Sequence, residues 1–285
     1  MQETLLRAWR AADGFEGRSS VRSWLYRIAT NICLDMLRGR QRRALPIDLG
    51  PASAPVETLL GEPRPDDAWV SPIADSRIMS ADPAEIAVAR ESIRLAFVAA
   101  LQHLPARQRA ALILCEVLKM PAAEAAATLA MSVPAINSAL QRARATMAAV
   151  SADSPPSGAP DSALIDQYVD AFQRYDMSAL VKLLHDDAVM SMPPFSMWLR
   201  GKADIVEFML QPGVQACRGS RWLPVQAGPV NGVLALAQYR RAPEGGYAAW
   251  GLQVHEAAGG RFTRLTYFLD TERLFPEFGL PDRVS

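Results

Sequence analysis

The stretch 121–149 constrains the fold of this chain more than any other, because it has the pattern of two helices joined by a tight turn. Small apolar residues predict the inward face of the first helix, at Ala123, Ala126, Ala127 and Leu129. Ala130-Met131-Ser132 interrupts that pattern. Ser132 is a good helix N-cap, and Pro134 falls in the first turn of the next helix, where a missing N–H costs little. We therefore expect a helix-turn-helix hairpin.

The second helix of this hairpin is predicted to be amphipathic. Ile136, Leu140 and Ala143 recur at spacings of four and three and so share one face. The opposite face is polar and carries Asn137, Ser138, Gln141, Arg142 and Arg144. A polar helix of this kind can enter the major groove of DNA. An ordinary α-hairpin has the same pattern, so the segment alone leaves both interpretations open.

The segment before the hairpin, 101–118, favours the first interpretation. It has Pro105 near a helix start and an apolar face predicted at Ala110, Ile113, Leu114 and Val117. Such a helix would pack beneath the hairpin and support it.

Charge is distributed unevenly along the chain, although 30 Lys and Arg balance 30 Asp and Glu. The net charge is +4 over residues 1–50 and +3 over 101–150, but −4 over 51–100 and −3 over 151–285. Two basic segments around an acidic one suit two nucleic-acid-facing pieces joined by a linker.

The three cysteines, Cys33, Cys115 and Cys217, are far apart and match no metal-binding spacing. Their apolar surroundings predict buried free thiols, and the absence of a disulfide framework fits a reducing compartment. The chain has no apolar run long enough for a membrane span and no signal-peptide pattern. We therefore expect a cytoplasmic protein with no membrane partner, no metal site and no cofactor.

Residues 1–44 are predicted to form helices on both sides of a break at 13–17. The second helix should bury an apolar stripe, consisting of Val21, Trp24, Leu25, Ile28, Ile32 and Met36. Its other face is polar and basic, with Arg22, Arg27, Thr30, Asn31, Asp35 and Arg38.

Motifs in these two helical segments point to a known family. The N-terminal segment has a QET-LxRAW opening and an F-x-G-x-S-S-V-R-S-W-L-Y-R-I-A-x-N block, and LPxRQRxAxxL precedes the hairpin. Residues 1–44 resemble region 2 of bacterial sigma factors of the extracytoplasmic-function type, with its N-terminal part missing, and residues 85–150 resemble region 4. The resemblance implies two all-α modules. The Pro-rich, acidic segment 45–84 is predicted to be a linker, with Trp69 as a point that docks on a neighbouring domain.

The resemblance also implies roles for individual residues. The partners would be promoter DNA and the RNA polymerase core, through the largest-subunit clamp and the flap. Reading of the −35 element would fall to Ser132, Pro134, Ala135, Asn137, Ser138, Gln141, Arg142 and Arg144. Reading and opening of the −10 element would fall to Arg22, Trp24, Arg27, Asn31, Asp35 and Arg38, although Trp24 also fits a plain core position. Polymerase binding would fall to Gln2, Glu3, Arg7 and Trp9.

A second linker, 151–161, leads into a region of different character. Residues 162–285 show helices first and then strand-like runs separated by glycine turns, which predicts an α+β fold. The motifs LxxYVxAFxxYDxxAL and FLDTxRLFPEFGLP make this region similar to SnoaL-like domains. The resemblance implies a cone-shaped domain with a curved antiparallel sheet, which modulates sigma activity and leaves a small-molecule ligand open as a further partner.

Some proteins of that fold are enzymes that use an Asp or His in the pocket. Candidates in this chain are Asp176, His185, Asp186, His255 and Asp270. Helix-end and turn roles explain most of them, and no acid/base pair is evident, so we predict no catalytic residues and no enzyme. The leading hypothesis is a promoter-specific sigma factor. The alternatives are a ligand-responsive helix-turn-helix regulator and a SnoaL-like enzyme fused to a DNA-binding module.

Overall fold

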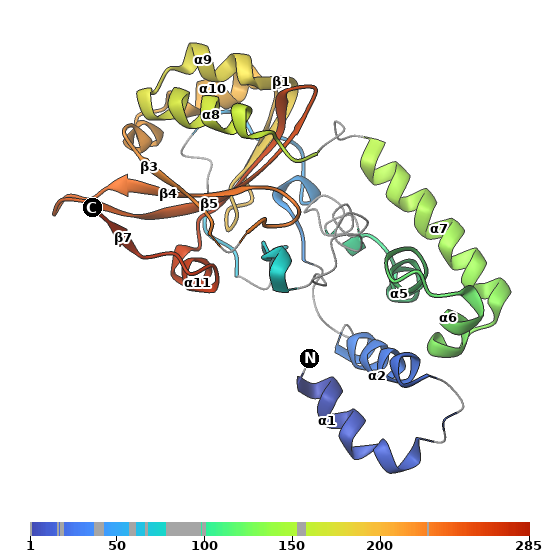
Figure 1. Ribbon diagram of the computed structural model, residues 1–285. Coiled ribbons are helices and arrows are strands. Elements are labelled where there is room, and N and C mark those ends of the chain that lie inside the picture. The colour runs from blue at the N-terminus through green and yellow to red at the C-terminus, as the bar shows by residue number, and fades with distance from the viewer. Residues whose placement is uncertain are drawn as a thin grey trace. The chain divides into compact units, whose positions relative to one another are not determined.

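The computed structural model in Figure 1 describes residues 2–15, 17, 20–36, 43–56, 61–65, 68–77, 98, 101–152, 158–226 and 228–285. The chain divides into two compact units, and each unit is formed by two stretches that are separated in the sequence. The first comprises Met1–Arg42 and Ala100–Asp153, and the second comprises Arg43–Ala99 and Ser154–Ser285. Among the described residues, no helix is both long and apolar enough to cross a bilayer.

The first unit is entirely helical. Its elements are α1 (Gln2–Arg10), η1 (Ala12–Gly14), α2 (Val21–Met36), α5 (Ala106–Leu112), the π-helical turn η6 (Ile113–Val117), α6 (Ala122–Leu129) and α7 (Val133–Ala152). Helix α2 packs against α1, α5 and α6, and α7 packs against α5 and α6. The two helical segments predicted from the sequence therefore share one body.

The predicted hairpin is confirmed, with α6 and α7 joined by a tight turn. Ala130 takes a left-handed conformation with φ 51°, and the N–H of Met131 donates to the carbonyl of Ala126 at 2.9 Å. The hydroxyl of Ser132 accepts from the N–H of Ala135 at 3.3 Å, as expected of an N-cap. These bonds satisfy main-chain groups that the two helix ends would leave unpaired.

Two predicted helix faces are shifted by one position. In α6, Ala125 is buried beside Ala126 and Leu129, whereas Ala123 and Ala127 are exposed. The segment is nearly all alanine, so neighbouring stripes of the helix differ little in hydrophobicity. In the supporting helix, Leu114 is buried as predicted, but Ala111 and Leu112 are buried in place of Ala110 and Ile113. The π-helical turn explains this second shift, because its wider turn changes which residues point inward.

The second unit is an α+β domain built on one seven-stranded sheet. Its helices are α8 (Ser162–Arg174), α9 (Met177–Leu183), α10 (Lys202–Met209) and α11 (Thr271–Glu277), with 3-10 turns η2 (Pro46–Asp48), η5 (Asp75–Arg77) and η7 (Val214–Cys217). Its strands are β1 (Leu184–Ser191), β2 (Trp198–Arg200), β3 (Arg221–Pro224), β4 (Ala235–Arg241), β5 (Tyr247–Ala258), β6 (Arg261–Phe268) and β7 (Arg283–Val284).

The sheet has the order β2-β1-β6-β5-β4-β3, with β7 paired to β5. The sheet is antiparallel as expected except at one place, where β1 and β6 run parallel and make it a mixed sheet. A parallel pair needs a long crossover, and the chain between these two strands provides it with α10 and the meander β3–β5. The other strand pairs are antiparallel.

Two hydrophobic clusters hold this unit together. One contains residues of helices α8, α9 and α10, with Tyr168, Phe208 and Phe262 fully buried. The other contains residues of α11 and of the segment 43–77, with Tyr239 and Phe275 fully buried. Figure 1 shows α8, α9 and α10 grouped on one side of the strands and α11 on the other. Because strand residues alternate between faces, the sheet contributes to both clusters.

Residues 43–77, here called the strap, belong to this second unit. Their described parts contain 3-10 turns and isolated bridges, in keeping with the poor periodicity of the segment. Leu45, Val70 and Ala74 are part of the second hydrophobic cluster, and Trp69 is only 4% exposed. The strap therefore docks on the C-terminal domain, as the hypothesis about Trp69 requires. The start of the segment that resembles region 4, residues 85–97, lies outside the described residues.

Candidate nucleic-acid interface

Helix α7 has the two faces that the sequence predicts. Ile136 and Ala143 are fully buried, and Leu140 is 7% exposed. The polar residues of the opposite face are exposed: Asn137, Ser138, Gln141, Arg142 and Arg144. The buried face packs on α5 and α6, so the fold directs two amides, a hydroxyl and two guanidinium groups to solvent.

The remaining predicted residues of this helix lie at its start. Ser132 and Pro134 are exposed and Ala135 is half-buried. At the other end of the polar face, Arg144 forms an exposed ion pair with Glu116 of η6. This pair links α7 to η6, a contact that spacing along the sequence did not reveal. Arg142 projects from the same surface one position before the buried Ala143.

Helix α2 presents a second polar surface. Arg27, Asn31 and Asp35 are exposed, and Trp24 is half-buried, with its ring 5.1 Å from that of Phe15. These positions share one side of the helix, since residues advance about 100° each. Arg22 lies on the opposite side, with its guanidinium 5.5 Å from the ring of Tyr26, so it does not join that surface. Arg38 lies outside the described residues.

Helix α1 carries an exposed apolar surface beside its predicted polymerase-binding residues. Trp9 is 76% exposed, Leu5 57% and Leu6 42%, and Arg7 is also exposed. A cluster of large apolar side chains in solvent is typical of a protein interaction site. Leu5 and Leu6 were not among the predicted site residues, although their spacing to Trp9 was a usable signal. The side chains of Gln2 and Glu3 lie outside the description.

The two polar helices, α2 and α7, belong to the same unit and are connected through α6. Helix α2 packs against α6, the first helix of the hairpin, and the hydroxyl of Ser23 hydrogen-bonds to the carboxylate of Glu124. Sequence reasoning did not foresee this contact, because Ser23 and Glu124 lie 101 residues apart. The described residues therefore show one compact body with two exposed polar helices.

The interior of the C-terminal domain contains a chain of hydrogen bonds between buried side chains. Gln238 donates to Ser220 at 2.9 Å, Gln253 donates to Gln238 at 2.6 Å, and Tyr168 donates to Gln253 at 3.1 Å. Tyr267 lies 2.7 Å from the Tyr168 hydroxyl. Burial raises the pKa of both tyrosines, so their hydroxyls stay protonated. Pattern analysis of the sequence did not find this chain.

His255 joins this buried chain as a neutral ring. Its Nε2 lies 2.7 Å from Oε1 of Gln253, which already accepts from Tyr168, so Nε2 acts as the donor. Desolvation lowers the pKa of His255 to about 3. Its Nδ1 is buried and has no hydrogen-bond partner within the described part of the chain. The ring is therefore a buried structural group with one unsatisfied acceptor.

The other acid/base candidates hold structural positions. Asp176 caps α9 through the N–H of Ala179 at 2.9 Å, and Asp186 pairs with Lys202, which lowers the pKa of that carboxyl. His185 accepts from the N–H of Asp187 through Nδ1 at 3.1 Å. Across the described ranges, no group of three or more His, Cys, Asp and Glu side chains is arranged to hold a metal ion.

The cysteines are only partly as predicted. Cys217 is buried, and burial raises the pKa of its thiol. Cys115 is half-buried, and Cys33 is exposed on α2. The expectation of a buried thiol is wrong for Cys33, because its side of the helix lies outside the apolar stripe.

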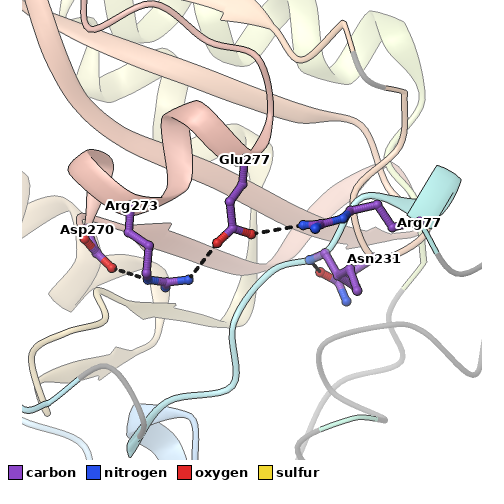
Figure 2. Close-up of polar contacts among 6 residues, drawn as sticks. Arg77, Asn231, Asp270, Arg273 and Glu277 are labelled. Carbon is purple, nitrogen blue, oxygen red and sulfur yellow. Dashed lines mark hydrogen bonds and ion pairs between the residues drawn. The ribbon is translucent and has the colours of Figure 1, made fainter. Parts of the chain in front are cut away.

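The strap is attached to the C-terminal domain at two adjacent places. One is a buried pair of hydrogen bonds, here called the corner, and the other is an exposed group of ion pairs, here called the relay. Asn231 accepts from the N–H of Ile73 through Oδ1 at 2.9 Å, and Asp75 accepts from the N–H of Gly232 at 2.9 Å. Beside this corner, Figure 2 shows Glu277 between two arginines, 3.3 Å from Arg77 of the strap and 3.4 Å from Arg273. In each of the two corner bonds, a main-chain N–H on one side of the seam donates to a side-chain oxygen on the other.

A shallow, open depression lies where the strap crosses the domain. Trp69, Val70 and Ser71 line it from the strap, and Pro193, Pro194 and Asp270 are among its residues on the domain side. Ligand pockets for small organic molecules are usually larger and better enclosed. This depression therefore belongs to the seam between strap and domain.

Three family matches cover most of the chain. Residues 1–43 match "Sigma-70 region 2", residues 94–147 match "Sigma-70, region 4", and residues 165–265 match "SnoaL-like domain". The order and bounds of these matches agree with the two helical segments and the α+β domain described above.

Individual relatives match over most of the chain. The chain is 44% identical over 290 residues to the ECF RNA polymerase sigma factor SigG of Mycobacterium tuberculosis, across 100% of this chain and 77% of that protein. It is 28% identical over 219 residues to SigJ of the same species, covering 74% of this chain and 63% of SigJ. The crystal structure of SigJ superposes with a TM-score of 0.58 at 22% identity, over 99% of this chain and 89% of that one. The chain belongs to the ECF family of RNA polymerase sigma factors.

Proposed function

We propose that this sigma factor directs RNA polymerase to specific promoters by reading two DNA elements. In the proposed division of the chain, region 2 (1–44) and region 4 (85–150) are joined by a linker (45–84). A second linker (151–161) precedes the C-terminal domain (162–285). The observation that carries the proposal is the exposed polar face of α7, which stands opposite a fully buried one.

Region 4 would read the −35 element through this face. Asn137 offers the amide that can pair with the major-groove edge of adenine, and Arg142 offers a guanidinium for guanine or phosphate. Region 2 would act at the −10 element through the side of α2 that carries Arg27, Asn31 and Asp35. There, Trp24 and Phe15 would provide aromatic surface for unstacked bases.

The polymerase contacts would come mainly from α1. The exposed Trp9, with Arg7 beside it, suits docking on the clamp of the largest subunit, and region 4 would meet the flap. With polymerase as its partner, the protein would act in the cytoplasm.

Run-off transcription tests the proposal. Core polymerase with this protein should start transcripts at a defined promoter, and Asn137→Ala should change base preference at one −35 position, at a cost of about 1–3 kcal/mol in recognition. Arg142→Ala should weaken binding to all sequences and reduce its salt dependence. Arg174→Ala, on the exposed side of α8, is the matched control. Core binding without promoter-dependent transcripts would refute the proposal.

We further propose that the C-terminal domain modulates this activity through the strap. The strap makes up most of the proposed linker between regions 2 and 4, and it is anchored at Ile73, Asp75 and Arg77. While the strap is anchored, its residues cannot extend, so the length of linker available to separate the two DNA-reading modules is shorter. A domain that holds or releases the strap would therefore change how far apart the modules can move.

The interior chain of the C-terminal domain supports a non-catalytic role. Gln238, Gln253 and Tyr168 satisfy one another, and a neutral His255 has no neighbouring carboxylate bonded to it among the described residues. General acid/base catalysis needs such a partner close to substrate and a pKa near the working pH. Turnover of a small carbonyl or steroid-like substrate by the intact protein would contradict this part of the proposal.

A further inference from the structure

One end of the C-terminal sheet collects arginines that the proposed function does not use. These residues, here called the arginine rim, lie around the β4–β5 turn and are Arg218, Arg221, Arg240, Arg241 and Arg283. The β-ladder explains the grouping, since Arg221 pairs with Tyr239 on β4, Arg241 with Tyr247 on β5, and β7 with the start of β5. Figure 1 shows β3, β4 and β7 together on this side of the domain.

The charge of the rim differs in sign from that of its domain. Residues 151–285 carry twelve basic and fifteen acidic side chains, a net of −3. Five of those twelve cations are in the rim, whereas two acids, Glu244 and Asp282, lie there among the described residues, which leaves a net of +3. The rest of the stretch is thus strongly negative, and the domain is electrically polarised with its positive end at the rim.

Aromatic rings hold three of these guanidinium groups in place. Arg240 lies over the ring of Trp250 at 4.1 Å, and Arg221 and Arg241 lie over Tyr247 at 4.7 and 5.7 Å. Arg240 also donates from Nε to the carbonyl of Ala216, and Arg221 contacts the main-chain oxygen of Ser285. A guanidinium stacked on a ring keeps N–H groups along its edge, so it gives up less side-chain entropy when it binds an anion.

Chain connectivity keeps this domain close to promoter DNA. Residue 36 ends α2 and residue 44 is already paired within the second unit, so eight residues span at most about 29 Å. Helix α7 ends at residue 152 and Gly158 is bonded to Ala257 of β5, so six residues span at most about 22 Å. Both DNA-reading modules are therefore tied to this domain by short connections.

From these observations we infer that the arginine rim binds the phosphate backbone of promoter DNA between the −10 and −35 elements. The inference rests on the proposed function, because it takes the two modules to be on their elements. A stacked, planar guanidinium suits phosphate oxygens, and backbone contact needs no particular base sequence. The rim then acts as a third DNA contact, which adds affinity and holds the C-terminal domain against the spacer.

Salt dependence of promoter binding tests the inference. The full chain with core polymerase is titrated onto a promoter duplex at several KCl concentrations, for the wild type and for Arg221→Gln/Arg240→Gln/Arg241→Gln. Each phosphate that the rim no longer neutralises should lower the slope of log affinity against log salt by about 0.9, so the triple variant should reduce the slope by up to about 2.7. The expected result also includes weaker backbone protection of the spacer in hydroxyl-radical footprints.

Two matched variants make the result specific. Arg174→Gln/Lys182→Gln/Arg261→Gln removes three exposed cations elsewhere on the same domain and should leave the slope unchanged. Arg221→Lys/Arg240→Lys/Arg241→Lys keeps the charge while removing the stacked geometry, and should keep most of the slope. The inference is overturned if the first control reduces the salt slope as much as the Gln variant does. It is also overturned if the Gln variant leaves the slope unchanged, an outcome that would leave the rim to an acidic protein partner.

The outcome also separates this inference from the proposed function. If the wild type starts transcripts at one promoter and the Gln variant retains the full salt slope and spacer protection, the rim has no role on DNA while the sigma activity stands. If the wild type gives no promoter-dependent transcript, the proposed function itself has failed. Equal thermal unfolding of the variants shows that the domain remains folded in each case.

Discussion

At the residue scale, His255 couples the stability of the C-terminal domain to pH. Burial lowers its pKa to about 3, against about 6.5 in an unfolded chain. Between these values the unfolded state binds the extra proton, so the free energy of unfolding falls as the pH falls below about 6.5. The decrease should be on the order of 1 kcal/mol for each pH unit between 6 and 4. Urea unfolding at pH 7, 6, 5 and 4 measures it.

A comparison of variants isolates the contribution of this ring. His255→Gln keeps a donor toward Gln253 but cannot titrate, so its stability should fall less steeply over the same range. His185→Gln, at a half-buried position on β1, should behave like the wild type. If His255→Gln follows the wild-type curve at every pH, the acid sensitivity arises from other groups.

The same residue shows what residue-level sequence reasoning can reach. Strand periodicity is visible around His255, but it does not tell which of two faces is the filled interior or which side chains meet there. Gln238 and Gln253 lie on neighbouring strands, and Tyr168 comes from a helix 85 residues before Gln253. Because pairing between distant elements depends on packing and register, the chain of hydrogen bonds is evident only in three dimensions.

At the element scale, the strap should be held mainly by its buried corner. Asn231 and Asp75 are at most 5% exposed, and each accepts a main-chain hydrogen bond across the seam. Asn231→Ala or Asp75→Ala leaves a buried N–H unpaired, which costs about 1–3 kcal/mol. Exposure of the strap to hydrogen exchange should therefore rise about tenfold or more. Promoter output should change with it, because the linker gains reach.

The exposed relay beside the corner provides the control. Arg77→Ala removes the ion pair with Glu277, in which the side chains are 58% and 37% exposed. Exposed pairs of this kind contribute at most about 1 kcal/mol, so strap exchange should change little. Should Arg77→Ala release the strap while Asn231→Ala does not, the corner is not the anchor.

Elements differed in how well their sequence pattern predicted them. Helix α7 was predicted with both faces, because Ile136, Leu140 and Ala143 contrast with polar neighbours. In α6 this contrast is missing, since small alanines stand on every side, and the inward face was displaced by one residue. The π-helical turn η6 was not foreseeable from the helical period of 3.6 residues. The buried face of a helix could thus be predicted correctly only where apolar and polar residues contrast strongly around it.

At the scale of the whole molecule, two associations between distant parts of the chain could not be predicted from their order in the sequence. The sequence suggests regions 2 and 4 as separate modules joined by a linker that docks through Trp69, yet the two regions share one unit while the strap belongs to the other. The parallel pairing of β1 with β6 is of the same kind, because it joins strands that are far apart in the chain. Local patterns determine elements and turns, while the choice among distant partners depends on complementary surfaces.

The proposed reading of two DNA elements requires the first unit to open. Helix α2 packs on α6, and packed helices have axes only about 8–10 Å apart. The −10 and −35 elements are about 25 base pairs apart, which is about 85 Å along the duplex at 3.4 Å per pair. Both modules cannot occupy their elements while Ser23 stays bonded to Glu124. We therefore expect the free protein to be closed and the promoter complex to be open.

Fluorescence transfer can follow this opening. Cys33 is exposed on α2 and takes one dye, and Ala148→Cys on α7 takes the other, with Cys115 and Cys217 replaced by Ser. Transfer should be high for the free protein and low in the complex with core polymerase and promoter DNA. Equal transfer in both states would show that the closed unit is also the reading form.

Locking the contact tests whether opening is required for activity. Ser23→Cys and Glu124→Cys, joined by a short bis-maleimide, should hold α2 on α6 and abolish promoter-dependent transcripts, because the two modules can then no longer separate. With Cys33, Cys115 and Cys217 replaced by Ser in every variant, each single variant treated with the same reagent should remain active, since it lacks the second attachment point. The cross-linked protein should still bind core polymerase through α1, whose exposed Trp9 does not depend on opening. Normal initiation by the cross-linked form would contradict the requirement, since a joined pair of modules cannot reach two elements about 85 Å apart.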